Sequence, residues 1–202
     1  MVALWLGIFL AVLVWSGINP KDQLTWLLEV APALIGFVVL AFTWKRFRLT
    51  SLAYWLILIH SIILMVGGHY TYAEVPVGDW VSELFGWSRN NYDKLGHFAQ
   101  GFIPAILARE ILIRKQVVNG RYWLNFLVVC FCLGFSAFYE LVEWWAALLS
   151  GDSATAFLGT QGYQWDTQSD MWYALMGAVS ALLLLTRWHD RLLREIQVTA
   201  KE

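Results

Sequence analysis

Three pairs of ionisable residues have a spacing that places both members on one face of a helix. They are Asp93 and His97 in NYDKLGHFAQGF, Glu140 and Glu143 in FYELVEWW, and Asp166 and Asp170 in WDTQSDM. Residues three or four positions apart are neighbours on a helix surface, so each pair can present two polar groups in one direction. Each pair lies in or beside an apolar stretch, where ionisable groups usually face the interior of a bundle or a wet cavity.

These residue types are suited to acid/base or metal chemistry. Carboxylates that lie close together repel one another unless a cation or a shared proton lies between them. Histidine with aspartate and glutamate is a ligand set for zinc or another divalent metal, which can activate a bound water. The candidate acid/base residues are Glu140, Glu143 and Asp93, and the candidate metal ligands are His97, Asp166, Asp170 and His69.

Each residue also has a purely structural explanation. Asp93 is expected in the first turn of a helix, where the helix dipole favours a negative charge. Thr167 and Asp170 fit a variant of the capping box. His97 alone is typical of a hydrogen-bonded core histidine. Glu140 and Glu143 are the hardest to explain in this way, because they lie well inside an apolar helix and need partners.

The composition indicates that lipid covers much of the surface. The chain has 202 residues, of which 59% are hydrophobic and only 14% are charged, and its mean hydropathy is +0.55. Soluble domains usually contain about 25% charged residues. The net charge of −1 leaves no basic face for nucleic acid.

The apolar segments predict an all-α, polytopic membrane helix bundle that forms one transmembrane domain over residues 1–202. A helix needs roughly 20 apolar residues to cross a bilayer. About six segments come close to that length, namely 2–18, 24–43, 50–69, 94–113, 123–148 and 169–187. The first has no Lys or Arg before its apolar run and no small-residue cleavage site after it, so we expect a retained helix rather than a signal peptide.

The basic residues predict the orientation, because cytoplasmic loops retain Lys and Arg. Most of the 14 basic residues fall in the 44–48 loop, in the connection around 114–121 and near the C-terminus. With six spans these regions share one side, so both termini are predicted to be cytoplasmic. The polar, turn-rich stretch 70–91 and the loop 150–168 then face outward, and the candidate site residues lie near the outer leaflet.

Four blocks of the sequence resemble a known family. They are GGHYTYAEVP (67–76), YDKLGHFAQGFIPA (92–105), FYELVEWWAA (138–147) and FLGTQGYQWDTQSDMWYALMGA (157–178), and together they resemble the bacterial inner-membrane YjdF family. The resemblance covers essentially the whole chain. It implies a multi-span protein of the inner (plasma) membrane described by a domain of unknown function. A shorter likeness, DKLGHF with Asp170 and Gly177, resembles the VanZ-like membrane proteins and implies a role near the cell envelope.

Three functions are compatible with these features. The first is an envelope protein with a polar pocket open to the outer leaflet, which binds membrane lipids, a lipid-linked molecule or a headgroup, or acts as a metal-assisted hydrolase. The second is a proton- or cation-coupled transporter, and the third is a membrane scaffold. The sequence has no G-x-S-x-G or H-E-x-x-H pattern and no matched pair of interrupted helices.

Other polar residues receive structural interpretations. Glu110 and Arg114 are spaced for an ion pair within one helix. Glu29 has no evident partner, and His60 is expected to bond to a neighbouring helix. His189 lies in a basic tail and is predicted to be solvated.

Overall fold

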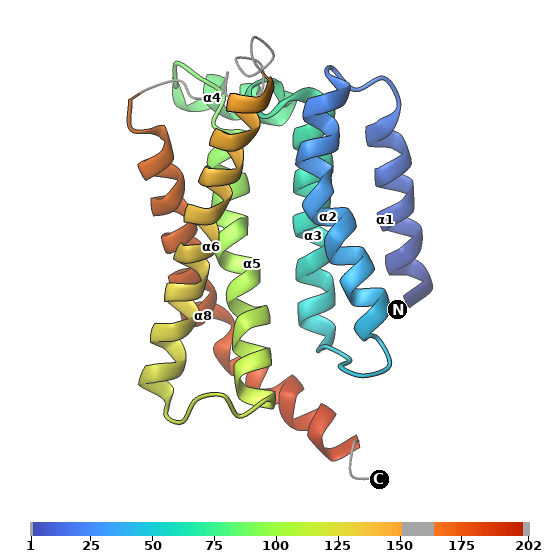
Figure 1. Cartoon of the computed structure of the whole chain (residues 1–202), viewed down its shortest axis with the longest axis vertical. Coiled ribbons are helices and arrows are strands. Elements are labelled where there is room, and N and C mark those ends of the chain that lie inside the picture. The colour runs from blue at the N-terminus through green and yellow to red at the C-terminus, as the bar shows by residue number, and fades with distance from the viewer. Residues whose placement is uncertain (1, 151–163, 200–202) are drawn as a thin grey trace.

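The computed structural model describes residues 2–150 and 164–199, and the regular secondary structure of this part of the chain is entirely helical (Figure 1). The long helices are α1 (Val2–Gly17), α2 (Gln23–Thr43), α3 (Ser51–Tyr70), α5 (Tyr92–Arg114), α6 (Arg121–Ser150) and α8 (Asp166–Thr199). Two short elements, η1 (Tyr72–Glu74) and α4 (Pro76–Phe85), connect α3 to α5. The predicted all-α membrane bundle is therefore confirmed. Most of the 150–168 loop lies outside the described residues.

Four helices in the described part of the chain are long and apolar enough to cross a membrane. They are Gln23–Thr43, Ser51–Tyr70, Arg121–Ala146 and Asp166–Ile196. α1 is equally apolar but has only 16 residues. α5 has 23 residues and measures about 35 Å, but it carries charged residues at both ends. The number of crossings therefore stays a prediction.

The helix ends follow local rules of capping. The carboxylate of Asp22 accepts a hydrogen bond from the Thr25 amide at 2.7 Å and so caps the start of α2. The Thr50 hydroxyl does the same for the Ala53 amide at the start of α3. Pro76 begins α4, and Gly86 ends it in the left-handed conformation.

The connection between α3 and α5 is more ordered than predicted. Instead of a turn-rich loop, η1 and α4 lie across the upper end of the bundle (Figure 1). α4 buries Gly78 and Ser82 and exposes Trp80, Leu84 and Phe85. The prediction was wrong here because ten residues with both small polar and large apolar side chains form an amphipathic helix, which suits a membrane–water boundary.

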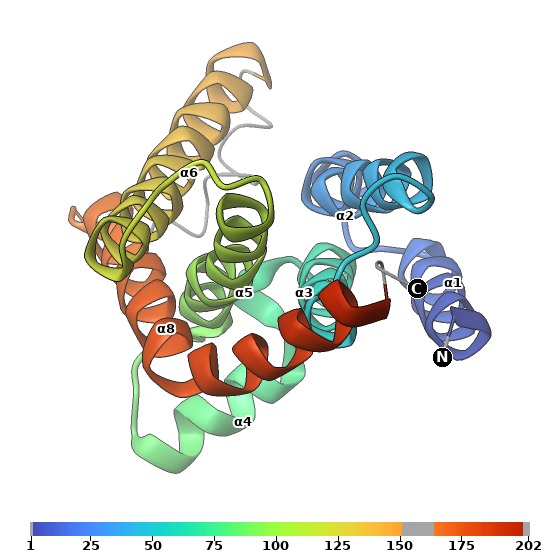
Figure 2. The ribbon, with the colours of Figure 1, turned by 90° about the horizontal axis from the view of Figure 1, so that it is seen from below.

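α5 is the central helix and packs against α3, α6 and α8 (Figure 2). Its closest neighbour is α8, because a glycine on each helix lies directly against the backbone of the other. A Cβ atom at Gly101 would collide with the backbone of Ala174, and one at Gly177 would collide with the Phe98 carbonyl. Small residues that allow such close approach are common where membrane helices meet. This contact fixes the register of α5 against α8.

α3 joins α1 and α2 to the rest of the bundle. It packs against α1 and α2 on one side and against α5 on the other. Trp5 of α1 donates its indole N–H to the Tyr54 carbonyl of α3 at 2.8 Å. α2 packs on α3 and, within the described residues, has no extensive contact with α5 or α6.

Candidate polar site and lateral cavity

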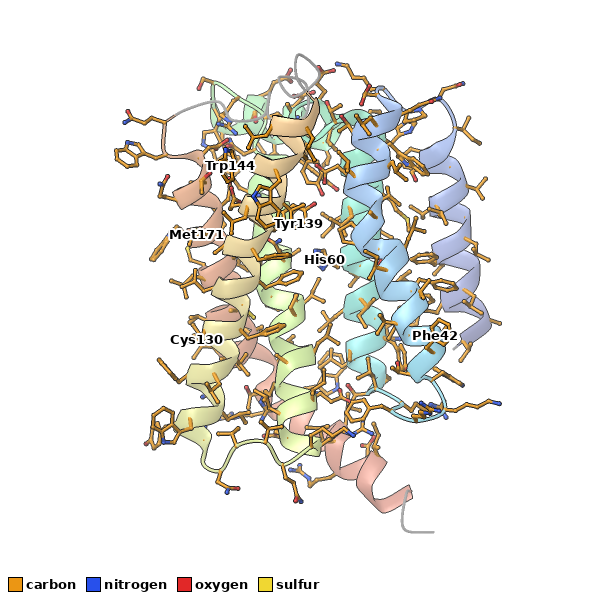
Figure 3. All side chains as sticks on the ribbon, in the orientation of Figure 1. Phe42, His60, Cys130, Tyr139, Trp144 and Met171 are labelled. Carbon is orange, nitrogen blue, oxygen red and sulfur yellow. The ribbon has the colours of Figure 1, made fainter. Side chains whose placement is uncertain are left out.

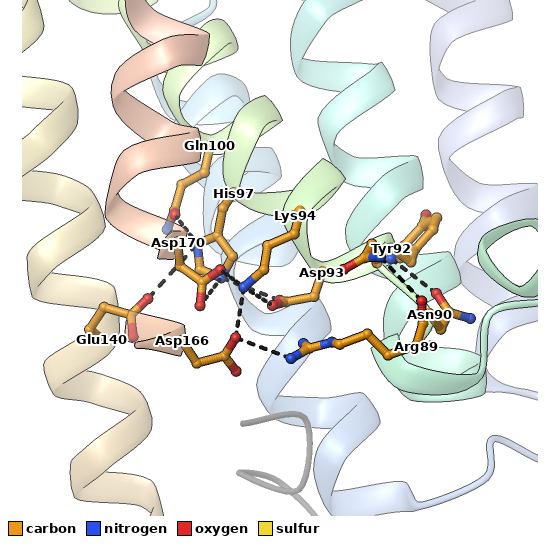
Figure 4. Close-up of polar contacts among 11 residues, drawn as sticks. Arg89, Asn90, Tyr92, Asp93, Lys94, His97, Gln100, Glu140, Asp166 and Asp170 are labelled. Atoms are coloured by element: carbon orange, nitrogen blue, oxygen red, sulfur yellow. Dashed lines mark hydrogen bonds and ion pairs between the residues drawn. The ribbon is translucent and has the colours of Figure 1, made fainter. Parts of the chain in front are cut away.

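Residues from all three predicted polar pairs meet where α5, α6 and α8 come together, at the end of the bundle that is uppermost in Figure 1, and Figure 4 shows the contacts among most of them. α5 contributes Asp93 and His97, α6 contributes Glu140, and α8 contributes Asp166 and Asp170. We call these five residues, with Lys94 and Glu143, the upper cluster. The contact between α5 and α8 sets the heights of these side chains, and the helical spacing sets their direction.

Lys94 lies among three carboxylates. Its ammonium nitrogen is 2.7 Å from Oδ1 of Asp166, 2.5 Å from Oδ1 of Asp170 and 3.6 Å from Oδ2 of Asp93. Arg89 adds a longer contact to Asp166, at 3.5 Å. Asp166 and Asp170, which the sequence predicts as metal ligands, are thus held by a buried ammonium group. The sequence interpretation missed Lys94, although a lysine next to Asp93 at the start of an apolar helix is a usable signal.

His97 links α5 to both neighbouring helices. Its Nε2 lies 3.3 Å from Oδ1 of Asp93 and 3.8 Å from Oδ2 of Asp170. Its Nδ1 lies 3.0 Å from Oε1 of Gln100 and 3.9 Å from Oε1 of Glu140. The imidazole therefore stands between the Lys94 side of the upper cluster and the carboxylates of α6.

Two sets of side chains are close enough to share a metal ion. The first is Asp93, His97 and Asp170, and the second is His97, Glu140 and Glu143. In each set the candidate ligand atoms lie within 4.8 Å of one another. Glu140 is 8% exposed, and its Oε1 has no hydrogen-bond partner within the described part of the chain.

His69 belongs to a different contact. Its Nδ1 lies 3.0 Å from the Ser16 carbonyl of α1. Its ring packs on Trp15, with the ring centroids 4.6 Å apart. It is absent from both sets described above, so the structure does not bring this predicted ligand to the upper cluster.

A cavity of about 570 Å³ extends below the upper cluster, between α2, α3, α5 and α6. Most of its lining is apolar, with Leu40, Ile57, Ile103 and Phe135 as examples. Its polar lining residues near the upper cluster include Glu29, Asp93, His97, Gln100, Tyr139 and Glu143. His60, which lies near the middle of α3, also lines the cavity (Figure 3). Thr43, Phe47 and Lys115 line the opposite end.

Aromatic side chains shape the polar end of this cavity. The hydroxyl of Tyr139 lies 3.5 Å from Oε2 of Glu29, so Glu29 has a partner that the sequence did not reveal. Tyr72 is buried between Gly67 of α3 and Gly96 of α5, and a Cβ atom at either glycine would collide with its ring. Burial raises the pKa of the Tyr72 phenol well above its usual value, so this hydroxyl stays neutral.

A second polar cluster lies at the other end of α5. The fully buried Glu110 carboxylate accepts hydrogen bonds from the Thr50 amide and hydroxyl, at 3.0 and 2.7 Å, and from Arg114 at 2.8 Å. The intrahelical pair with Arg114 is thus confirmed. His189, predicted to be solvated, is fully buried, with Nε2 3.1 Å from Glu110 and Nδ1 3.0 Å from Arg109. The prediction was wrong because α8 continues past the apolar run and packs back on α5. We call Glu110, Thr50, Arg114, His189 and Arg109 the lower cluster.

The hydrogen bonds of the lower cluster fix one form of His189. The Arg109 guanidinium can only donate, so Nδ1 of His189 accepts its hydrogen bond. Nε2 of His189 then carries the ring proton and donates a hydrogen bond to Glu110. Arg109 also pairs with Asp190 at 2.5 Å. Every partner of Glu110 is therefore a donor aimed at its carboxylate.

Comparisons with known proteins agree with the family resemblance. Residues 1–191 match the family model described as predicted membrane protein (DUF2238). The chain is 57% identical to the inner membrane protein YjdF of Escherichia coli (strain K12) over 183 aligned residues. The aligned region covers 91% of this chain and 88% of the relative. No solved structure matches, and the VanZ-like resemblance is not shown by these comparisons. The chain therefore belongs to the DUF2238 family of predicted membrane proteins and is a relative of the inner membrane protein YjdF, as its four sequence blocks predicted.

Proposed function

We propose that this integral inner-membrane protein binds a membrane lipid or lipid-linked molecule, with an apolar chain in the cavity and the headgroup at the upper cluster. The observation that carries the proposal is the cavity itself. It combines a long apolar lining with carboxylates and an imidazole near one end. Its volume of about 570 Å³ is within the usual range for small-molecule sites.

The arrangement of α2 supports entry from the bilayer. α2 packs on α3, and within the described residues it has no extensive contact with α6. Both helices contribute to the cavity lining, α2 through Pro32 and Gly36 and α6 through Phe135 and Tyr139. A Cβ atom at Gly36 would meet nothing within 4 Å. The proposed route for a lipid chain therefore runs between α2 and α6, below the contact of Tyr139 with Glu29.

The charges at the upper end restrict the headgroup. Glu29, Asp93 and Glu143 all line the cavity, and ionisable residues at this depth are functional candidates by default. An anionic group would be repelled there unless a cation accompanied it. The upper end therefore favours a headgroup that carries an amine or binds together with a metal ion.

The charge distribution supports placing this headgroup site near the outer leaflet. The start of α1, the end of α8, the loop after α2 and the loop after α5 lie toward the lower end of the bundle (Figure 1). The two loops contain Lys45, Arg46, Arg48 and Lys115, and basic loops are retained in the cytoplasm. Both termini are then cytoplasmic, and the upper cluster faces outward.

Filling the cavity tests the proposal. Gly36→Phe places a ring in the open space beside α2, whereas Gly7→Phe puts the same ring on α1, where a Cβ atom also meets nothing within 4 Å. We expect the wild type and Gly7→Phe to retain a co-purified lipid in native mass spectrometry and lipid extraction. Gly36→Phe should retain at least fivefold less. Equal retention in all three proteins, or a wild type that carries no lipid, would contradict the proposal.

The alternative functions make different predictions in the same preparation. A coupled transporter would move protons or cations across liposomes, and Glu143→Gln would abolish that flux. A metal-assisted hydrolase would convert the bound lipid rather than return it unchanged after extraction. A scaffold would carry no lipid that Gly36→Phe displaces.

A further inference from the structure

We propose that His97, Glu140 and Glu143 bind a divalent cation through one imidazole nitrogen and two carboxylates, with an open coordination position toward the cavity. The inference deepens the proposed lipid function, because the cation would supply the headgroup end with a positive charge. The cation site itself does not depend on whether a lipid binds.

The three side chains converge from two packed helices. Glu140 and Glu143 are spaced i, i+3 on α6 and share a face, and α6 packs against α5, which carries His97. One ligand atom from each residue lies within 4.8 Å of the other two. A small movement of these side chains would bring all three to the distances of about 2.0–2.2 Å that zinc prefers for nitrogen and oxygen ligands.

The Glu140 carboxylate provides independent support for a bound cation. The residue is 8% exposed, and in the described part of the chain no donor reaches its Oε1 atom. This oxygen faces Nδ1 of His97 at 3.9 Å, too far for a hydrogen bond. A buried carboxylate oxygen without a donor is costly, and a cation between it and the imidazole would remove that cost.

Asp93 lies where a supporting residue for such a site is expected. Its Oδ1 is 3.3 Å from Nε2 of His97, so it can accept that N–H and leave Nδ1 to the cation. A carboxylate that orients a metal-binding histidine in this way is common around metal sites. Nδ1 also lies 3.0 Å from Oε1 of Gln100, so metal binding requires the Gln100 side chain to move away from the ring.

The charge of Lys94 disfavours a metal ion at the other set of candidate ligands. Asp93, His97 and Asp170 also have suitable spacing, but Asp170 is 2.5 Å from the ammonium nitrogen of Lys94. A metal ion there would be repelled by that charge. The sequence predicts His97, Asp166, Asp170 and His69 as metal ligands, and the proposed set shares only His97 with that prediction.

The ligand types indicate which ions and ligands the site would take. One nitrogen and two oxygens suit zinc or manganese, and three protein ligands leave at least one position open. His97 and Glu143 both line the cavity, so that position faces the space proposed for the lipid. A phosphate or carbonyl oxygen of the headgroup is the class of group that would bind there.

Zinc binding to the purified full-length protein tests the site. After chelator treatment and removal of the chelator, the wild type should take up about one equivalent of Zn²⁺ in isothermal titration with zinc alone. Glu140→Gln and Glu143→Gln should each weaken that binding at least tenfold. Glu83→Gln on α4, an exposed control, should bind like the wild type. No uptake by the folded wild type, or equal affinity in all four proteins, would overturn the proposal.

X-ray absorption at the zinc edge keeps the test independent of variant folding. The zinc-loaded wild type should show one imidazole nitrogen with carboxylate oxygens, and a shell with sulfur or several imidazoles would overturn the assignment. Asp93→Asn should weaken zinc binding about 10–100-fold if it orients His97. Gly36→Phe should bind zinc normally while losing lipid. Lipid retention without zinc uptake would reject the cation site and leave the proposed function standing.

Discussion

The lower and upper clusters at the two ends of α5 differ in how completely their carboxylates are paired. In the lower cluster, Glu110 accepts bonds from Thr50, Arg114 and His189, and every contact is a donor held by packed helices. In the upper cluster, Oε1 of the buried Glu140 has no donor among the described residues, and neighbouring groups line a cavity. A buried carboxylate that is fully paired in this way stabilises a fold, whereas an incompletely paired one beside a cavity is suited to a ligand.

Glu110→Gln should have the largest effect on stability. The amide replaces one acceptor oxygen with a donor, which then faces donors from Thr50 or His189. Removing one partner from a buried charged network typically costs about 3–5 kcal/mol. Unfolding in mixed micelles, followed by circular dichroism, would measure this loss. Glu83→Gln on exposed α4 should change the free energy of unfolding by less than about 0.5 kcal/mol. A loss below about 1 kcal/mol for Glu110→Gln would mean that the lower cluster is not the structural one.

Lys94→Met should have the next largest effect, about 2–3 kcal/mol, because it leaves the buried Asp166 and Asp170 without their nearest cation. Lys45→Met, in the exposed loop after α2, is the matched control and should be nearly neutral. The same unfolding assay measures both variants. If Lys94→Met were as stable as the wild type, the ammonium group would not be what holds the acidic half of the upper cluster together.

Glu140→Gln should have the smallest effect on stability, less than about 1 kcal/mol in either direction. Its Oε1 has no hydrogen bond to lose within the described structure, and the amide removes a buried charge. The contrast with Glu110→Gln is the informative quantity, because both substitutions change one buried carboxylate to an amide. Similar losses for the two variants would show that Glu140 is structural as well, and would remove the distinction between the clusters.

The sequence was sufficient to predict the long helices and the faces of the polar pairs. Apolar length identified the long helices, and i, i+3 and i, i+4 spacing identified pairs such as Asp93 with His97, which lie 3.3 Å apart. These features depend on the local geometry of one helix. The family blocks added the membrane setting, which the comparisons confirm.

The partners across helices could not be predicted in the same way. Lys94 reaches Asp166 and Asp170 because Gly101 and Gly177 allow α5 and α8 to approach closely in one register. Periodicity does not specify which helices become neighbours or at what height. The burial of His189 and the contact between Glu29 and Tyr139 were missed for the same reason.

The position of α5 at the centre of the bundle has a consequence for biogenesis. Lys94 and Arg109 lie toward the two ends of α5, where a charged residue still costs free energy in a single helix entering the bilayer, although less than the about 2.5–3.5 kcal/mol at its centre. Their partners Asp170 and His189 lie on α8, which the ribosome makes last. α5 should therefore settle stably only after α8 has been synthesised, and a nascent chain halted before Asp166 should leave α5 exposed to membrane quality-control proteases.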